Sequence, residues 1–382
     1  MRKKRSYFGG LTALNGIFFA LAFLLLAVQD GVTEKYWLAA GCTVFLLAGA
    51  FTFPVLFRID KLLLALVNFF AALSLLLVEL AIPDRLLPHL LALAAGYACL
   101  FCFLGLGRAA PESPAAAWLS AVLALVVLAL PLAVSLPGSV GPAACVLLLL
   151  AFPVLLARRQ LLPAALLVLL AICLMLLRGD WASALGLALA FALLAWSSSG
   201  SWLVLIASVA LAGGLGWAAL RFLPNLSPGL LYWLSARNQA IAFSGGLFGT
   251  GLGLGSSVDF SESTSVLPLC LVGEQFGSVF LCCLVLVLAA LLLRGVSIAA
   301  ASRRNVSALR GMGAVILLSC QALVALGSLL GWLPLPAAGF PLLSFDPLSL
   351  VSAFALVGFL SGIHAANQSD LKEDTHLAML AH

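Results

Sequence analysis

Charged residues are scarce in this sequence. Aspartate, glutamate, lysine and arginine make up 9% of its 382 residues, whereas hydrophobic residues make up 64% and the mean hydropathy is +1.21. An ordinary soluble domain is about one quarter charged, so this composition excludes the soluble classes. The short alternating segments of a membrane β-barrel are also missing. A polytopic helical membrane protein fits, because each helix satisfies its own backbone hydrogen bonds in lipid.

Histidine is equally rare, and the cysteines lack the spacing of a metal site. The chain has 4 histidines and 9 cysteines, and nearly all of the cysteines lie inside apolar runs. Cys99 and Cys102 form a CxxC pair, but no second pair or histidine lies near them in the sequence. Buried structural cysteine explains this pattern best, with zinc or redox use as the alternative. We therefore predict no metal ligands on the protein.

Apolar segments of membrane-spanning length recur along the whole chain. They predict an all-α bundle of about 10–12 transmembrane helices, since one span needs about 20 apolar residues. We expect this bundle to form a single membrane domain over residues 1–382. The segments lie near 11–28, 37–57, 62–83, 90–107, 117–135, 142–157, 161–178, 182–197, 201–222, 265–293, 308–331 and 345–364.

The positive charges predict how this bundle is oriented. If the spans alternate from a cytoplasmic start, 14 of the 19 lysines and arginines fall on the cytoplasmic side, which is the bias of inner loops. The basic start at Met1 is interpreted as this cytoplasmic N-terminus and not as a signal peptide, because no small-residue cleavage site follows the first apolar run. Both termini are then cytoplasmic, residues 223–264 form a large extracytoplasmic loop, and residues 365–382 form a loose cytoplasmic tail.

One polar, glycine-rich stretch, Arg237 to Gly277, interrupts the apolar pattern. Glycine at this density usually marks turns or a close approach of two backbones. Gly245, Gly249 and Gly253 have GxxxG spacing, which favours small-residue packing. Successive backbone amides could instead form a nest for a phosphate. No GK[ST] follows the glycines, so a P-loop is excluded.

Three charged side chains in or near the apolar segments are candidates for function. Glu274 lies inside an apolar run, where an acid marks either a functional site or a buried structural pair. Asp180 stands where its carboxylate could cap the next helix, and this explanation competes with substrate contact. Arg178, two residues earlier, could pair with Asp180 or face a pyrophosphate.

The polar stretch resembles the SEDS family of bacterial cell-wall proteins (FtsW, RodA and SpoVE). Gln239, the SGGLFGTGLGLG run from Ser244 and the GEQFG run from Gly273 match the family pattern at its usual spacing. Residues 179–185 and 321–334 resemble further family segments. The resemblance implies a SEDS-like bundle that polymerises lipid II, or a similar undecaprenyl-pyrophosphate-linked substrate, in the bacterial cytoplasmic membrane. The substrate-binding residues that we expect are Arg178, Asp180, Gln239, Ser244, Gly245, Gly246, Gly249, Gly251, Gly253 and Glu274.

Two family motifs are altered in this chain. The acid that the family is thought to use as general base falls on Val266, and valine cannot accept a proton. Glu262, which matches a family glutamate, and Asp259 lie in the same loop, and we predict them as replacement catalytic acids. Asp346 and Pro347 replace a pair of glycines that the family uses in a tight turn.

The resemblance implies a peptidoglycan synthesis protein that serves cell division, cell shape or sporulation. Its expected partners are a class B penicillin-binding transpeptidase and other membrane proteins of division or elongation complexes, with no nucleic acid. No cofactor is implied beyond a divalent cation that could accompany the lipid pyrophosphate. One alternative is a catalytically inactive relative that acts as a scaffold or holds the lipid-linked precursor. Another is a lipid flippase or transporter, although the paired broken repeats that many transporters carry are not evident.

Overall fold

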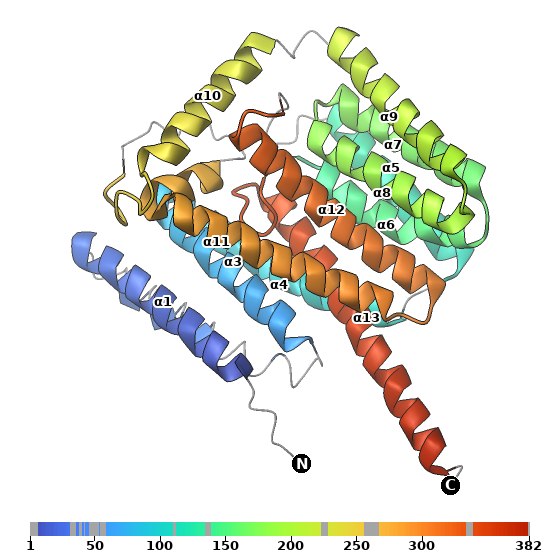
Figure 1. Cartoon of the computed structure of the whole chain (residues 1–382), viewed down its shortest axis with the longest axis horizontal. Coiled ribbons are helices and arrows are strands. Elements are labelled where there is room, and N and C mark those ends of the chain that lie inside the picture. Colours follow the sequence, from blue (N-terminus) through green and yellow to red (C-terminus); the bar gives the residue numbers. More distant parts are fainter. Residues whose placement is uncertain are drawn as a thin grey trace.

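The computed structural model describes residues 7–30, 36–37, 40–41, 43–45, 53, 59–109, 112–133, 139–222, 228–255, 267–333 and 339–380. All secondary structure within these ranges is helical, which confirms the predicted all-α class (Figure 1). The helices are α1 (Tyr7–Asp30), α3 (Lys61–Ala81), the 3-10 helix η1 (Pro83–Arg85), α4 (Leu86–Ala109), α5 (Pro114–Ala133), α6 (Gly141–Ala157), α7 (Leu161–Leu177), α8 (Trp181–Ser199), α9 (Trp202–Phe222), α10 (Pro228–Ser244), α11 (Leu267–Ala300), α12 (Asn305–Leu329) and α13 (Pro347–Leu380).

The described helices account for nearly all of the predicted spans. Eight segments are long and apolar enough to cross a membrane, and three shorter helical segments, in α6, α7 and α9, are also apolar. Each of them overlaps one of the predicted apolar segments. The remaining predicted segment, 37–57, falls mostly outside the described residues. The chain is therefore a multi-pass helical membrane protein.

Two segments predicted as irregular are helical. Helix α10 occupies the first part of the predicted extracytoplasmic loop, where Pro228 stands at the first helical position and needs no amide hydrogen of its own. Residues 365–380, predicted as a loose tail, continue α13 without interruption. Both segments are too polar to be found as spans, and their helical character was missed for that reason.

Among the described helices, α4 and α13 share the most extensive contact, and they run parallel. A Cβ atom on Gly358 would meet the Leu100 carbonyl oxygen, and one on Gly362 would meet that of Leu104. Gly107 of α4 lies in the same way against Phe359. Small residues four apart let two membrane helices approach to backbone contact, so this seam depends on glycine.

The bundle has two distinct ends (Figure 1). At one end, which we call the loop end, α10 and the start of α11 lie together, and Gln29 at the end of α1 reaches the glycine-rich segment at Gly253. Helix α1 begins and α13 finishes on the other side of the bundle, which we call the opposite end. The start of α1 and the end of α13 thus lie on the same side, as the charge pattern predicts, and the sidedness itself stays a prediction.

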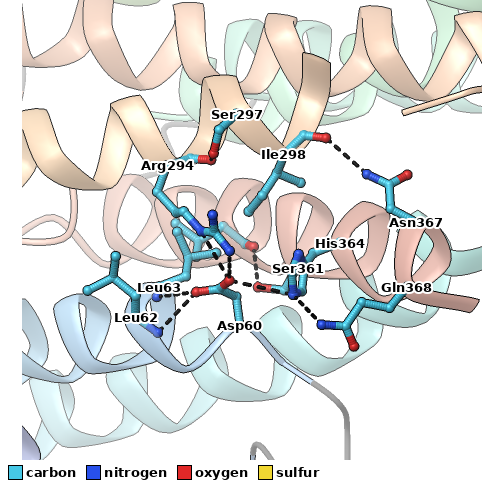
Figure 2. Close-up of polar contacts among 11 residues, drawn as sticks. Asp60, Leu62, Leu63, Arg294, Ser297, Ile298, Ser361, His364, Asn367 and Gln368 are labelled. Atoms are coloured by element: carbon cyan, nitrogen blue, oxygen red, sulfur yellow. Dashed lines mark hydrogen bonds and ion pairs between the residues drawn. The ribbon is translucent and has the colours of Figure 1, made fainter. Parts of the chain in front are cut away.

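At the opposite end, three helices meet at an ion-pair cluster formed by Asp60, Arg294 and His364, the Asp60 cluster. Figure 2 shows the Asp60 carboxylate between Arg294 of α11 and His364 of α13. Asp60 also caps α3, because its carboxylate accepts the amide hydrogens of Leu62 at 3.0 Å and Leu63 at 3.1 Å. Burial raises the pKa of the Asp60 carboxyl, but its hydrogen bonds and the Arg294 charge outweigh burial and hold that pKa below its ordinary value.

Candidate functional site

The glycine-rich segment 245–255, which we call the glycine loop, lies directly against α11. Helix α11 is broken at Gly277, whose φ of 87° and ψ of 169° leave the helical region. In an unbroken helix the amides of Ser278 and Val279 would bond the carbonyls of Glu274 and Gln275. At this break both pairs of groups find new partners in the glycine loop.

The new partners form a reciprocal exchange of backbone hydrogen bonds. The amides of Thr250 and Gly251 donate to the carbonyl oxygens of Glu274 at 2.9 Å and Gln275 at 3.2 Å. In return, the amide of Ser278 donates to Gly246 at 3.0 Å, and the amide of Val279 donates to Leu247 at 3.3 Å. These four backbone groups at the break are therefore satisfied, as a membrane interior demands.

This exchange explains why the segment is rich in glycine. A Cβ atom on Gly245 would meet the Glu274 carbonyl oxygen, and one on Gly249 would meet that of Gln275. From the other side, a Cβ on Gly273 would meet Ala242, and one on Gly277 would meet Leu247. The close-packing interpretation is therefore correct, with the difference that a loop and a broken helix approach each other, where GxxxG spacing suggested two helices.

The phosphate-nest interpretation is not supported for the middle of the loop. The amide of Gly249 bonds Gly245, the amides of Thr250 and Gly251 bond α11, and the amide of Leu254 bonds Gly251. The amide of Gly253 donates to the Gln275 side-chain oxygen at 2.8 Å. Because these amides are occupied, we expect the predicted glycines to shape the site and not to bind phosphate themselves.

Glu274 and Gln275 lie under the far end of the glycine loop. Both side chains are buried, and Glu274 is only 1% exposed. A Cβ on Gly255 would come within 3.1 Å of a Glu274 carboxylate oxygen, so this acid lies beneath the last described residue before the acidic segment 256–266. Gln275 was not among the predicted site residues, although its place in the GEQFG motif could have indicated it.

The predicted catalytic acids, Asp259 and Glu262, lie outside the described residues, as does Val266. Their roles stay predictions. On α10, Gln239 is half-buried, and the Ser244 hydroxyl donates to Ile241 of its own helix at 2.7 Å. The neighbouring Asn238 is more deeply buried, at 4% exposed, and was missed because a polar RNQ run gives no indication of which side chain points inward.

Asp180 does not cap the helix that follows it, which corrects one interpretation of the sequence. Its carboxylate makes no capping hydrogen bond to α8. It accepts instead from the Ser139 hydroxyl at 2.6 Å and from the Gly141 amide at 3.0 Å, at the start of α6. Asp180 thus caps a neighbouring helix, a role that depends on tertiary packing.

Asp346 joins this polar group at the loop end. Its carboxylate accepts from the Ser349 amide at 3.2 Å in the first turn of α13, and Pro347 begins that helix. Aspartate followed by proline is a favourable helix start, so a cap replaces the tight glycine turn. Burial raises the pKa of Asp346, and the negative charge of Asp180 raises it further, although backbone hydrogen bonds act in the lowering direction.

Arg178 follows the last turn of α7, three residues before α8 begins. Within the described chain it forms no ion pair with Asp180, so the first of its two predicted roles is excluded. One of its guanidinium nitrogens is buried without a hydrogen-bond partner. The indole nitrogen of Trp181 and the side-chain oxygen of Gln321 are likewise buried without a hydrogen-bond partner in the described chain.

The described surface also contains two apolar cavities. The larger, about 670 Å³, lies between α3 and α4 and is bordered by aromatic residues that include Trp37, Phe53 and Tyr97. The smaller, about 220 Å³, lies among α7, α8 and α9. In the part of the chain that the structure describes, no three histidine, cysteine or acidic side chains come together as metal ligands.

Known proteins resemble this chain in its second half and in its fold. A family model for FtsW, RodA and SpoVE, described as a cell cycle protein, matches residues 140–369. The peptidoglycan glycosyltransferase RodA of Mycobacterium leprae is 27% identical over 133 residues, which is 35% of this chain and 29% of that protein. The probable peptidoglycan glycosyltransferase FtsW of Haemophilus influenzae is 30% identical over 174 residues, 44% of this chain and 43% of that protein. The matched region thus spans less than half of each relative.

Two solved structures share the fold over most of their length. One is a chain from a peptidoglycan synthase complex that coordinates polymerisation and crosslinking; it is 23% identical with a TM-score of 0.60, covering 81% of this chain and 98% of that one. The other is the rod-shape-determining protein RodA of Thermus thermophilus, 22% identical with a TM-score of 0.56, covering 80% of this chain and 97% of that one. At these identities the likeness concerns the fold alone.

Proposed function

The chain belongs to the FtsW/RodA/SpoVE family of SEDS proteins, and on that premise we propose that it polymerises lipid II at the loop end of the bundle. The observation that carries this proposal is the backbone exchange between the glycine loop and α11. It holds together the two parts of the polar stretch that match the family pattern, although they are more than twenty residues apart.

The proposed reaction joins two sugars. A base in the 256–266 segment takes the proton of the acceptor hydroxyl, the hydroxyl oxygen forms a bond to the anomeric carbon of the donor, and the bond to the lipid pyrophosphate breaks. The pyrophosphate leaves with the bonding electrons. We assign the base to Glu262, with Asp259 as the second choice, because Val266 cannot accept a proton. A general base contributes a factor of about 10²–10⁴ in rate.

A second candidate is a relative without catalysis that holds the lipid-linked precursor for another enzyme. Val266 favours it, because the position of the family acid no longer titrates. The buried Glu274 beneath Gly255 would keep the substrate site polar in either case.

The surroundings of the reaction are part of the proposal. The partner is a class B penicillin-binding transpeptidase, which is supported by the likeness to a chain from a complex that couples polymerisation to crosslinking. The location is the bacterial cytoplasmic membrane with both termini inside, which is supported by the positive charges. A divalent cation could accompany the pyrophosphate, and no step of the reaction runs through it.

The test is polymerisation of labelled lipid II by the purified protein, with and without its cognate transpeptidase. We expect glycan strands from the parent, and we expect Glu262→Ala to lower the rate by about 10²-fold or more. Asp259→Ala tests the second choice of base in the same way, and Ser257→Ala, which removes no ionisable group from the same loop, is the matched control. Strands from the parent and from Glu262→Ala at equal rates would overturn the assignment of the base. Lipid II binding without strands would overturn polymerisation and leave the precursor-holding function.

A further inference from the structure

The turn between α7 and α8 carries hydrogen-bond donors that nothing in the described chain satisfies. Helix α7 finishes at Leu177, and Gly179, with φ of 74°, reverses the chain before α8 begins at Trp181. The turn is tight, because the amides of Arg178 and Asp180 both donate to the Met175 carbonyl, at 3.1 Å and 2.9 Å. A tight turn of this kind fixes the backbone from which these side chains project.

Two of these donors belong to side chains. One nitrogen of the Arg178 guanidinium and the indole nitrogen of Trp181 are buried and have no partner in the part of the chain described. Trp181 is only 5% exposed, whereas Arg178, Gly179 and Asp180 around the turn are half-buried. Buried donors are normally bonded, and leaving one unmet costs about 1–3 kcal/mol, so two within one turn need an explanation.

The start of α8 adds further donors. The residue at its N-cap, Asp180, would ordinarily bond the first-turn amides, but its carboxylate is bonded to Ser139 and Gly141 at α6. The 19-residue helix α8 therefore presents an uncapped N-terminus beside the two orphan side-chain donors. The amides and dipole of a helix N-terminus favour an anion.

Space for a ligand lies beside the same turn, over Gly179. Apart from its two neighbours in the chain, a carbon at the Cβ position of Gly179 would have one heavy atom of the described chain within 4 Å, the indole nitrogen of Trp181 at 4.0 Å. The turn is therefore open over Gly179, and the unmet indole nitrogen borders the opening. Arg178, on a long flexible stem, can turn toward the opening with a change of rotamer.

All of these groups donate, and neither arginine nor indole can accept a hydrogen bond, so the ligand must be an acceptor rich in oxygen. Arginine forms bidentate bonds to phosphate. We infer that Arg178, Trp181 and the N-terminus of α8 form a binding site for the phosphate group of an amphiphile, and that its occupant is the pyrophosphate of the lipid-linked sugar. The choice of occupant rests on the proposed function, whereas the site itself does not.

A simpler explanation for Arg178 is that its charge complements the C-terminus of α7. That role requires the charge alone. It leaves the buried nitrogen of Arg178 without a partner, and it does not involve Trp181 or the start of α8.

The site is tested by equilibrium binding of farnesyl pyrophosphate to the purified full chain in detergent, with farnesol, which has the same tail and no phosphate, as the control ligand. We expect the alcohol to bind at least about tenfold more weakly. Arg178→Gln should raise the Kd for the pyrophosphate about ten- to hundredfold, the range for a lost bond to a charged group. The Kd of Arg178→Lys should lie between those of the parent and Arg178→Gln, because lysine keeps the charge and loses the planar guanidinium.

Two more variants complete the design. Trp181→Phe, which removes only the indole donor, should raise the Kd by about fivefold. Arg85→Gln, at an exposed arginine in η1, should bind as the parent does. If Trp181→Phe does not fold, Arg178→Gln, at a half-buried position, decides the question with Arg178→Lys.

Equal binding by the parent and Arg178→Gln, or equal binding of pyrophosphate and alcohol, would overturn the site. A bilayer headgroup is the other source of a phosphate, so the titration is repeated in nanodiscs of phosphatidylcholine with and without phosphatidylglycerol. Displacement of farnesyl pyrophosphate by phosphatidylglycerol would support the anion site and overturn the lipid-linked sugar as its occupant. A parent that binds the pyrophosphate through Arg178 but forms no glycan strands would support this site while the proposed polymerisation fails.

Discussion

The two ends of helix α11 are joined to the rest of the molecule by opposite means. At the loop end, four backbone hydrogen bonds connect the region around Gly277 to the glycine loop. At the opposite end, the charged side chain of Arg294 reaches Asp60 at the start of α3. The first junction depends on the absence of side chains, and the second depends on the chemistry of particular side chains.

The difference has consequences for what each end can tolerate. A backbone junction carries no ionisable group, so pH and salt affect it little, but a Cβ at four of its glycines, Gly245, Gly249, Gly273 and Gly277, would collide with a carbonyl oxygen. The Asp60 cluster can accept some change of shape, because Arg294 is 37% exposed, yet it responds to protonation. The loop end of the helix is therefore the sterically strict one.

The largest effect should come from Gly277→Ala. The new methyl group would meet the Leu247 carbonyl, and alanine is strained at φ of 87°. Steric overlap and backbone strain each cost about 1–3 kcal/mol, so we expect a loss of roughly 3 kcal/mol in unfolding free energy. Thermal unfolding in detergent measures it. Gly105→Ala, at a helical glycine with no atom within 4 Å of its Cβ position, is the control. Equal midpoints would show that the junction is not strict.

Gln275→Met should have the next largest effect. It preserves the size of a buried side chain but leaves the Gly253 amide without its acceptor, which costs about 2 kcal/mol. Hydrogen exchange of the glycine loop should rise, while exchange in α13 stays constant. Gln368→Met, at an exposed glutamine of α13 that contacts His364, is the matched control. Unchanged exchange in the glycine loop would mean that backbone bonds alone hold it.

Asp60→Asn should lower the unfolding free energy by less, about 1 kcal/mol, because Arg294 is partly solvated. The folded pKa of Asp60 lies below its ordinary value of 3.8, so its contribution is complete above about pH 4 and is lost as the pH falls through the lowered pKa. Unfolding midpoints of parent and variant should therefore differ at pH 6 and converge toward pH 3. A difference that is constant over this range would contradict the ion pair as the cause.

Asp346→Asn should have the smallest effect on the unfolding free energy. The pH dependence of this effect should be opposite to that of Asp60→Asn. Its folded pKa lies above 3.8, so ionisation at neutral pH works against the fold, and the parent gains stability as the pH falls through the raised pKa. Asparagine still caps a helix, so the change at neutral pH should stay within about 0.5 kcal/mol. Midpoints measured from pH 7 to pH 4 should rise for the parent relative to the variant. A relative fall would reverse our account of this acid.

Local patterns in the sequence predict the helices well and predict their connections poorly. Apolar length alone locates the spans, because lipid leaves few alternatives to a helix of about 20 residues. The glycine run and the GEQFG motif also indicate where the loop end lies. Helix α10 cannot be found by apolar length, because its Arg237-Asn238-Gln239 run makes it too polar to be predicted as a span.

The partners of the polar residues are set by contacts distant in the sequence. Asp180 caps a helix that begins 39 residues earlier, and Asp60 meets an arginine 234 residues later. No periodicity contains that information, since either acid could have capped its own helix alone. The break in α11 was easier to predict, because a glycine in an apolar helix beside a glycine-rich segment suggests a close approach of two backbones.

The exchange at Gly277 also bears on how the protein is assembled. During synthesis α11 can first insert as a continuous helix, in which Glu274 and Gln275 bond the amides four residues ahead. The glycine loop precedes it in the chain, and docking of the loop replaces bonds within the helix around Gly277 by four bonds between the segments. We expect the break to form after insertion, as a late maturation step, so that the site exists only in chains whose loop has docked.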